Sequence, residues 1–215
     1  MQEGLHMNRI YAGAAILSVA ALLGGSLLWV SLKDADDAFA ACRGSAVAGD
    51  IGGPFTLVDE TGATVTDKDV LTKPSLIYFG YTFCPDVCPY DAARNAEAVA
   101  LLEERGLEVQ PVFISVDPAR DTPEVLADFT DNLHPRMIGL SGSPEQVKAA
   151  SQAYKTYYKI QDPEQEFYLI DHSTFTYFVM PEVGFVDFFK RDETPEQMAQ
   201  RVQCFMDAAA ASGKN

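Results

Sequence analysis

The sequence predicts an α/β domain built on a central mixed sheet and preceded by one N-terminal transmembrane helix. Two observations carry this prediction. From residue 75 onward, apolar runs typical of buried strands alternate with segments of helical periodicity, and such alternation produces a mostly parallel sheet covered by helices. Near the beginning of the chain, the run from Ile10 to Leu32 contains no charged residue.

The composition fits one globular domain and argues against some partners. Of the 215 residues, 47% are hydrophobic and 22% are charged, which excludes a disordered chain. Lys and Arg number 16 against 31 Asp and Glu, so the net charge is −15. A general nucleic-acid-binding protein would need a basic face, so we expect no nucleic-acid partner. Four cysteines are too few for a disulfide-built mini-fold and enough for one site and one disulfide.

The apolar run from Ile10 to Leu32 is predicted to anchor the chain in a membrane. At about 1.5 Å per residue it forms a helix of roughly 34 Å, which exceeds a bilayer core of about 30 Å. A cleaved signal peptide has a shorter apolar core, but Ala38 to Ala40 resembles a cleavage site, which leaves cleavage open. Residues 1–9 form a short N-terminal segment, and the polar residues 33–53 form a tether. We expect the body, residues 54–215, to be exported, so that in a bacterium it lies in the periplasm as the C-terminal domain of a single-pass inner-membrane protein.

The body begins with a small hairpin and then follows a strand–helix alternation. Residues 55–58 and 63–65 flank a polar turn typical of a hairpin. Further strands are predicted at residues 75–81, 109–116, 137–140, 167–170, 174–180 and 183–189. The last two of these form a closing antiparallel hairpin.

The helices are predicted from their periodicity and from their N-terminal signals. They cover residues 85–105, a segment that starts at 121–124, and residues near 144–159 and 195–210. Thr122, Ser143 and Thr194 each precede a proline, which suits the first helical position. After Ser143 and Thr194, a glutamine three residues on closes a capping box.

Cys84 and Cys88 are the first candidates for chemistry. They follow the buried strand at residues 75–81, where a helix begins. Sites of open α/β sheets form at such strand ends, and a helix N-terminus stabilises thiolates. The pair is a redox couple, two ligands of a metal or a structural disulfide. Its spacing departs from that of thioredoxin-type reductants, and structural zinc would need four ligands.

Two histidines lie in the body. His134 follows a predicted helix, where we expect it to act as a cation near the C-terminal end of the helix dipole. His172 lies in a polar break between two predicted strands. Together with the two thiolates it would complete a soft donor set that selects Cu(I) and tolerates Cu(II). Asp171 either orients the imidazole from outside the ligand set or has only a role in the turn, and Asp86 is a second candidate for a supporting role outside the ligand set.

Four stretches of the chain resemble the SCO/SenC family of cytochrome c oxidase assembly proteins. They are residues 52–55 (GGPF), 78–89 (YFGYTFCPDVCP), 115–123 (SVDPARDTP) and 171–173 (DHS). The first is weak alone, whereas the cysteine run, the aspartate-rich run and the downstream histidine are specific in combination. The resemblance covers nearly the whole predicted exported body.

The resemblance implies a thioredoxin-like fold and a copper site formed by Cys84, Cys88 and His172, with one copper per chain. It implies delivery of copper to the binuclear copper site of cytochrome c oxidase subunit II, or reduction of that subunit's cysteines. Another periplasmic copper chaperone would supply the metal. Thiol–disulfide oxidoreductase activity or redox signalling by Cys84 and Cys88 is the alternative function, so whether the protein is also an enzyme stays open.

Two further features are predicted to be structural. Cys42 and Cys204 lie near the two ends of the body, and chain termini are often close together, so we expect a disulfide between them after export. Asp117, Arg120 and Asp121 are expected to form a turn, a surface ion pair and a helix start. Such a pair contributes at most about 1 kcal/mol to stability.

Overall fold

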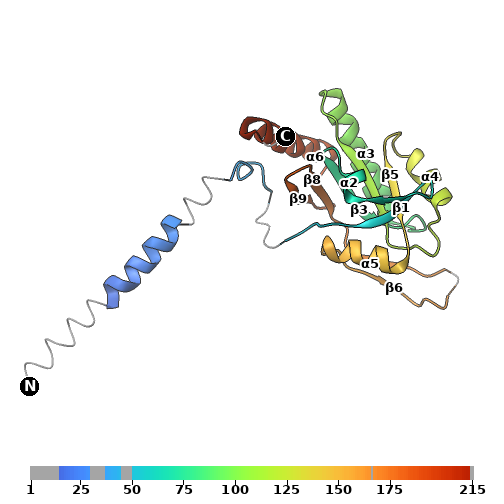
Figure 1. Ribbon diagram of the computed structural model, residues 1–215, viewed down its shortest axis with the longest axis horizontal. Helices are drawn as coiled ribbons and strands as arrows, with labels where there is room; N and C mark the ends of the chain where they lie inside the picture. Colours follow the sequence, from blue (N-terminus) through green and yellow to red (C-terminus); the bar gives the residue numbers. More distant parts are fainter. Residues whose placement is uncertain (1–14, 30–36, 45–49, 166, 214–215) are drawn as a thin grey trace, which may run out of the picture. The chain divides into compact units, whose positions relative to one another are not determined.

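The computed structural model describes residues 15–29, 37–44, 50–165 and 167–213 of the chain (Figure 1). The chain divides into two compact units, Met1–Ala41 and Cys42–Asn215. In the smaller unit, residues 15–29 are helical. Among the described residues, none of the helices combines the length and the apolar character that crossing a bilayer requires. The predicted span from Ile10 to Leu32 extends at both ends beyond the described residues.

The larger unit is built on a central mixed sheet, as predicted, and the described residues contribute seven strands to it. Its strand order is β2-β1-β5-β4-β3-β8-β9. β3, β4 and β5 are parallel to one another, whereas β1 pairs antiparallel with β2 and β5, and β8 pairs antiparallel with β3 and β9. The strands are β1 Thr56–Asp59, β2 Thr64–Thr66, β3 Ser75–Gly80, β4 Gln110–Ser115, β5 Ile138–Ser141, β8 Thr176–Met180 and β9 Gly184–Phe189. Every residue of β3 is buried, because helices cover both of its faces.

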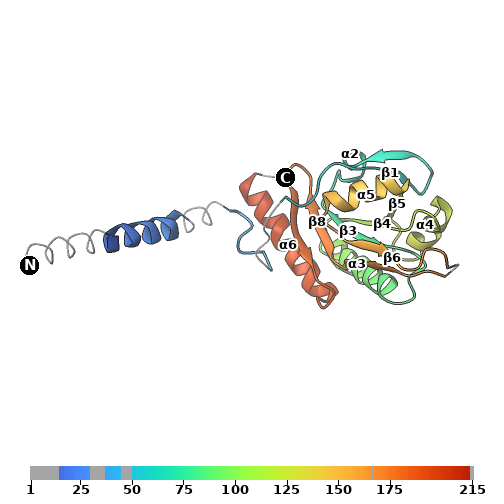
Figure 2. The same ribbon diagram turned by 90° about the horizontal axis from the view of Figure 1, so that it is seen from below.

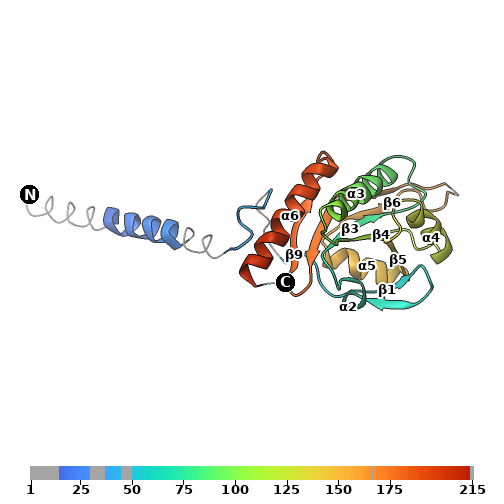
Figure 3. The same cartoon turned by 90° about the horizontal axis from the view of Figure 1, so that it is seen from above.

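Five helices are described in the larger unit: α2 Asp67–Val70, α3 Val87–Glu104, α4 Pro123–Asp131, α5 Pro144–Ala153 and α6 Pro195–Ser212. Figures 2 and 3 show α3 and α6 side by side on one face of the sheet and α5 on the other. Adjacent side chains of β8 pack against helices on opposite faces of the sheet. The ring of Phe178 lies 5.8 Å from that of Phe205 on α6, and the ring of Tyr177 lies 5.5 Å from that of Tyr154 at the end of α5.

The predicted helix starts are confirmed. Thr122, Ser143 and Thr194 each accept a hydrogen bond from the backbone N–H three residues on, and each precedes a proline in the first turn. Gln146 and Gln197 close the two predicted capping boxes. These caps satisfy backbone donors that a helix start leaves without an internal partner.

Two predicted elements of secondary structure are wrong, and two short elements were not predicted. The helix expected over residues 144–159 ends at Ala153, because Lys155 takes a left-handed conformation with φ 54°. The chain then enters an unpredicted strand, β6 Tyr158–Ile160, which pairs antiparallel with β7 Ile170–His172 in a separate two-stranded sheet. The strand expected at 167–170 is therefore displaced toward His172. The short helix α2 was also not predicted.

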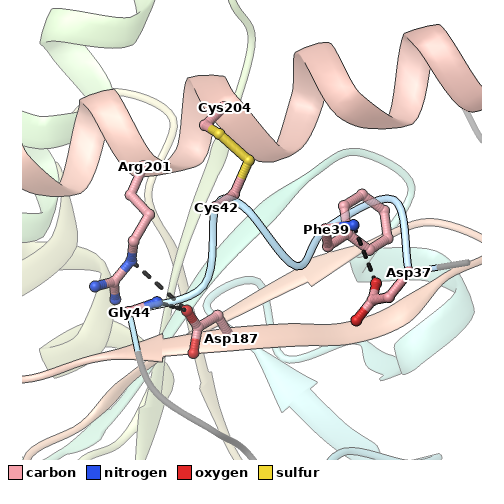
Figure 4. The surroundings of a disulfide bond; sticks show 7 residues. All are labelled: Asp37, Phe39, Cys42, Gly44, Asp187, Arg201 and Cys204. Atoms are coloured by element: carbon pink, nitrogen blue, oxygen red, sulfur yellow. Dashed lines mark hydrogen bonds and ion pairs between the residues drawn. A yellow bond between two sulfur atoms is a disulfide. The ribbon is translucent and has the colours of Figure 1, made fainter. Parts of the chain in front are cut away.

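A disulfide fastens the start of the larger unit to its last helix (Figure 4). Cys42 is bonded to Cys204 of α6, 162 positions away in sequence, and the two Cα atoms lie 5.7 Å apart. The Gly44 N–H donates to Asp187 Oδ2 on β9 at 3.1 Å, and Arg201 Nε lies 3.7 Å from the same oxygen. Because Asp187 is fully buried, the guanidinium and the backbone amide offset the cost of its charge.

Candidate metal centre

The two cysteines lie where β3 gives way to α3. β3 ends at Gly80, and its short exit loop is closed by a 3.3 Å hydrogen bond from the Cys84 N–H to the Tyr81 carbonyl. α3 begins at Val87, so Cys88 lies in its first turn. The first turn of a helix offers backbone N–H groups without internal partners, and these favour a negatively charged sulfur.

His172 is brought to the cysteines from the far end of β7. Its Nε2 atom lies 3.1 Å from Cys88 Sγ, and its Nδ1 atom lies 2.9 Å from the Ser173 carbonyl oxygen. The two sulfurs and one imidazole nitrogen all lie within 4.8 Å of one another. Two sulfurs and one nitrogen thus converge at one point of the fold, although His172 lies 84 positions after Cys88 in the sequence.

The surroundings of the two sulfurs make them unequal. The backbone N–H groups of Cys88 and Asp86 and the Cys88 thiol donate to Cys84 Sγ, and His172 contacts it too. The hydrogen bond from Cys88 and these other donors lower the pKa of Cys84. The same hydrogen bond, together with burial, raises the pKa of Cys88. In the metal-free dithiol form, the geometry therefore favours a thiolate at Cys84 and a thiol at Cys88.

Aromatic rings enclose the imidazole, and one side of the site is open. Tyr78 and Tyr81 present their rings nearly perpendicular to that of His172, with centroids 6.1 and 5.9 Å away. A depression of about 280 Å³ leads to the site and is lined by Cys84, Leu169 and their neighbours. Cys84 and His172 therefore face this depression, whereas Cys88 is fully buried behind them.

Two predicted supporting roles need correction. The Asp171 carboxylate accepts a hydrogen bond from Gln161 Nε2, and His172 Nδ1 faces the Ser173 carbonyl, so Asp171 does not orient the imidazole. The Asp86 side chain is exposed, and the residue acts on Cys84 through its backbone N–H. The true partner of His172 Nδ1 is a backbone carbonyl, for which side-chain identity gives no signal.

His134 and the aspartate-rich loop also differ from expectation. His134 is buried, and burial lowers its pKa although the Glu103 carboxylate opposes this, so the neutral form is favoured over the predicted cation. Asp117 and Arg120 form the expected ion pair, but Asp117 is fully buried, and so is Asp121. The expectation of a surface pair was wrong, because the loop after β4 packs against Thr82 and Tyr168.

The donor set determines which metal fits. Thiolate sulfur is a soft ligand that selects Cu(I), and imidazole also suits Cu(II). The two thiolates and the single imidazole therefore fit copper, and they leave room for an incoming ligand on the open side. The protein is therefore an α/β protein with two thiols and an imidazole at the C-terminal end of a parallel strand, and this class of protein can bind a soft metal ion.

The comparisons with known proteins identify the family within this class. The chain belongs to the SCO1/SenC family, whose model matches residues 43–207. It is 58% identical to Protein SenC of Rhodobacter capsulatus over 209 residues, which cover 96% of this chain and 94% of that protein. It spans about half to two thirds of the length of three mitochondrial relatives, from Arabidopsis thaliana, Saccharomyces cerevisiae and Homo sapiens.

Solved structures of relatives hold copper and share the fold. The crystal structure of Arabidopsis thaliana ScoI with copper bound is 39% identical, with a TM-score of 0.69 over 73% of this chain and 99% of that one. The structure of Bradyrhizobium japonicum ScoI with copper bound is 38% identical, with a TM-score of 0.65 over 71% and 98%. The predicted thioredoxin-like arrangement and the copper cofactor agree with these relatives.

Proposed function

We propose that the protein is a copper chaperone that binds one copper ion through Cys84, Cys88 and His172. The observation that carries this proposal is the 3.1 Å approach of His172 Nε2 to Cys88 Sγ, beside the Cys84 sulfur. Disulfide exchange needs only the two sulfurs, so an imidazole held against them argues for a metal. The copper held by relatives at 38–39% identity supports the same assignment.

The recipient we infer is the binuclear copper site of cytochrome c oxidase subunit II, and the donor is another copper chaperone. A site with three protein ligands and one open side suits transfer, because the acceptor's ligands can bind copper before Cys84, Cys88 and His172 release it. The acidic chain, with a net charge of −15, would steer basic surfaces toward it.

The proposed location is the bacterial inner membrane, with the copper-binding domain in the periplasm. The uncharged run from Ile10 to Leu32 supports a single-pass anchor. The Cys42–Cys204 disulfide supports an oxidising compartment, since such bonds are rare where thiols are kept reduced.

His172→Ala tests the proposed function. We expect the variant to lose stoichiometric copper through gel filtration, whereas the wild-type protein retains one copper per chain. Asp171→Asn is the matched control, because this side chain faces Gln161 and not the imidazole. The measurement is metal content together with the thiolate-to-copper absorption of the reduced protein. A His172→Ala variant that keeps one tightly bound copper would refute the ligand assignment.

A second activity is favoured by the inequality of the two sulfurs. The Cys84 thiolate would attack a sulfur of a target disulfide, form a mixed disulfide and release the first target thiolate. Cys88, deprotonated as it reacts, would then attack Cys84 Sγ and release the second. The target gains two electrons, Cys84 and Cys88 become a disulfide, and an external dithiol regenerates them. Insulin reduction that survives in His172→Ala would separate this activity from copper binding.

A further inference from the structure

The loop between β4 and α4 contacts the cysteine half of the proposed copper site. Asp121 Oδ2 accepts a hydrogen bond from the Thr82 N–H at 3.1 Å, and its Oδ1 accepts one from the Thr82 hydroxyl at 2.6 Å. The Arg120 guanidinium lies 5.1 Å from the centre of the Phe83 ring. Thr82 and Phe83 immediately precede Cys84, so this loop holds the segment that presents the first sulfur.

The same loop contacts the histidine half. The Tyr168 hydroxyl donates to Asp117 Oδ1 at 2.6 Å, and the Arg120 guanidinium lies 3.6 Å from the centre of the Tyr168 ring. The other oxygen of Asp117 pairs with Arg120 Nε. Tyr168 precedes β7, the strand that ends at His172. One guanidinium thus lies against aromatic rings from both halves of the site.

Burial makes the loop a rigid support. Asp117 and Asp121 have exposed fractions of 0% and 1%, so their charges depend on fixed partners. Ser115 joins the two, since its hydroxyl accepts from the Asp117 N–H at 2.9 Å and donates to the Asp121 carboxylate. A hydrogen-bonded network of this kind has few alternative arrangements, because any displaced partner would leave a buried charge without compensation.

We propose that Asp117, Arg120 and Asp121 form a bracket that sets the separation between the cysteine sulfurs and the His172 imidazole. Tyr168 is the positioning residue on the histidine side, where it couples the bracket to β7. This inference rests on the proposed function, because it concerns the geometry of the same copper site. Residues that hold metal ligands in place typically change metal affinity by about 10–100-fold when they are replaced.

Replacing Tyr168 tests the bracket. Tyr168→Leu removes both the hydrogen bond to Asp117 and the ring beneath Arg120, whereas Tyr168→Phe removes only the hydrogen bond. We expect the dissociation constant for Cu(I), measured by competition with a chelator, to rise about tenfold in Tyr168→Leu and less in Tyr168→Phe. Phe167→Leu is the matched control, because its side chain is 81% exposed and adjacent in sequence. Thermal unfolding checks that each variant is folded.

A double-mutant cycle with His172→Ala separates positioning from a general effect on the fold. The two thiolates alone still bind Cu(I), with lower affinity. If Tyr168 acts through the imidazole, Tyr168→Leu causes no further loss when His172 is already alanine. An equal loss of affinity in both backgrounds would overturn the proposal, and so would the absence of any loss in the wild-type background.

A metal-free measurement keeps the bracket and the copper function distinguishable. In the reduced protein, NMR should show contacts of the His172 ring with the Tyr78 and Tyr81 rings, which we expect to weaken in Tyr168→Leu and persist in Phe167→Leu. Weakened contacts in a protein that binds no copper would support the bracket and refute the copper function. Unchanged contacts in a protein that binds copper would refute the bracket alone.

Discussion

The two cysteine pairs of this chain differ in bonding and in surroundings: one pair forms a disulfide, and the other consists of free thiols. Cys42 and Cys204 lie 162 positions apart and are bonded to each other, beside a buried ion pair between α6 and β9. Cys84 and Cys88 are close in sequence and are free thiols, with backbone N–H groups and an imidazole aimed at the sulfurs. The first pair closes a large loop, whereas the second presents donor atoms to an open depression. The environment of a thiol, and not its presence, decides whether it is structural or reactive.

If copper binding did not require Cys84 and Cys88, the contrast between a structural pair and a reactive pair would be wrong. Oxidising Cys84 and Cys88 to a disulfide would remove both proposed thiolate ligands, so we expect complete loss of the one copper ion per chain that the proposed function assigns to the reduced protein. Metal content before and after treatment with an oxidant, and again after a dithiol restores the thiols, is the measurement. Retention of copper by the oxidised protein would contradict the prediction.

Removing the other pair should have a large effect on stability and none on copper. Cys42→Ser with Cys204→Ser frees a loop of 162 positions, and the loss of a native disulfide typically lowers the free energy of unfolding by about 2–5 kcal/mol. Denaturant unfolding measures this loss, and chelator competition measures copper affinity in the folded variant. A change in copper affinity would show that the two pairs are coupled, contrary to the comparison.

A further expected effect, which concerns reactivity and not copper or stability, is a difference in the pH dependence of alkylation within the free pair. Hydrogen bonds to its sulfur lower the pKa of Cys84, so its thiolate persists as the pH falls from 8 to 5, while the raised pKa of Cys88 keeps that thiol protonated. Iodoacetamide should therefore modify Cys84 first, at a nearly constant rate over this range. In the unfolded protein the rate should fall about tenfold per pH unit below the thiol pKa of about 8.5. Mass spectrometry of the modified peptides distinguishes the two cases, and a tenfold fall per unit at Cys84 in the folded protein would contradict the prediction.

Sequence reasoning succeeded where local signals are strong. The buried strand β3 is a continuous apolar run, and the helix starts at Ser143 and Thr194 carry caps and prolines that act within a few residues. The convergence of Cys84, Cys88 and His172 was reached through donor chemistry and family resemblance, since no local rule places a residue 84 positions away.

The errors share a physical cause, which is tertiary contact overriding local pattern. The helix expected to reach residue 159 stops at Ala153, because the chain turns at Lys155 to form β6 against β7. The role expected for Asp171 belongs to the Ser173 carbonyl, and backbone atoms leave no trace in a sequence. The contact between Asp117 and Tyr168 joins segments 51 positions apart and could be found only in the fold.

The bond between Cys42 and Cys204 also determines which residues would carry a mechanical force applied to the protein. Tension applied between the two chain ends passes along the backbone to Cys42, crosses the sulfur bridge and leaves through the rest of α6. Residues 43–203 would then bear none of it, so stretching the molecule with the Cys42–Cys204 bond intact would leave Cys84, Cys88 and His172 undisturbed, and only a molecule in which this bond is reduced would extend through its sheet.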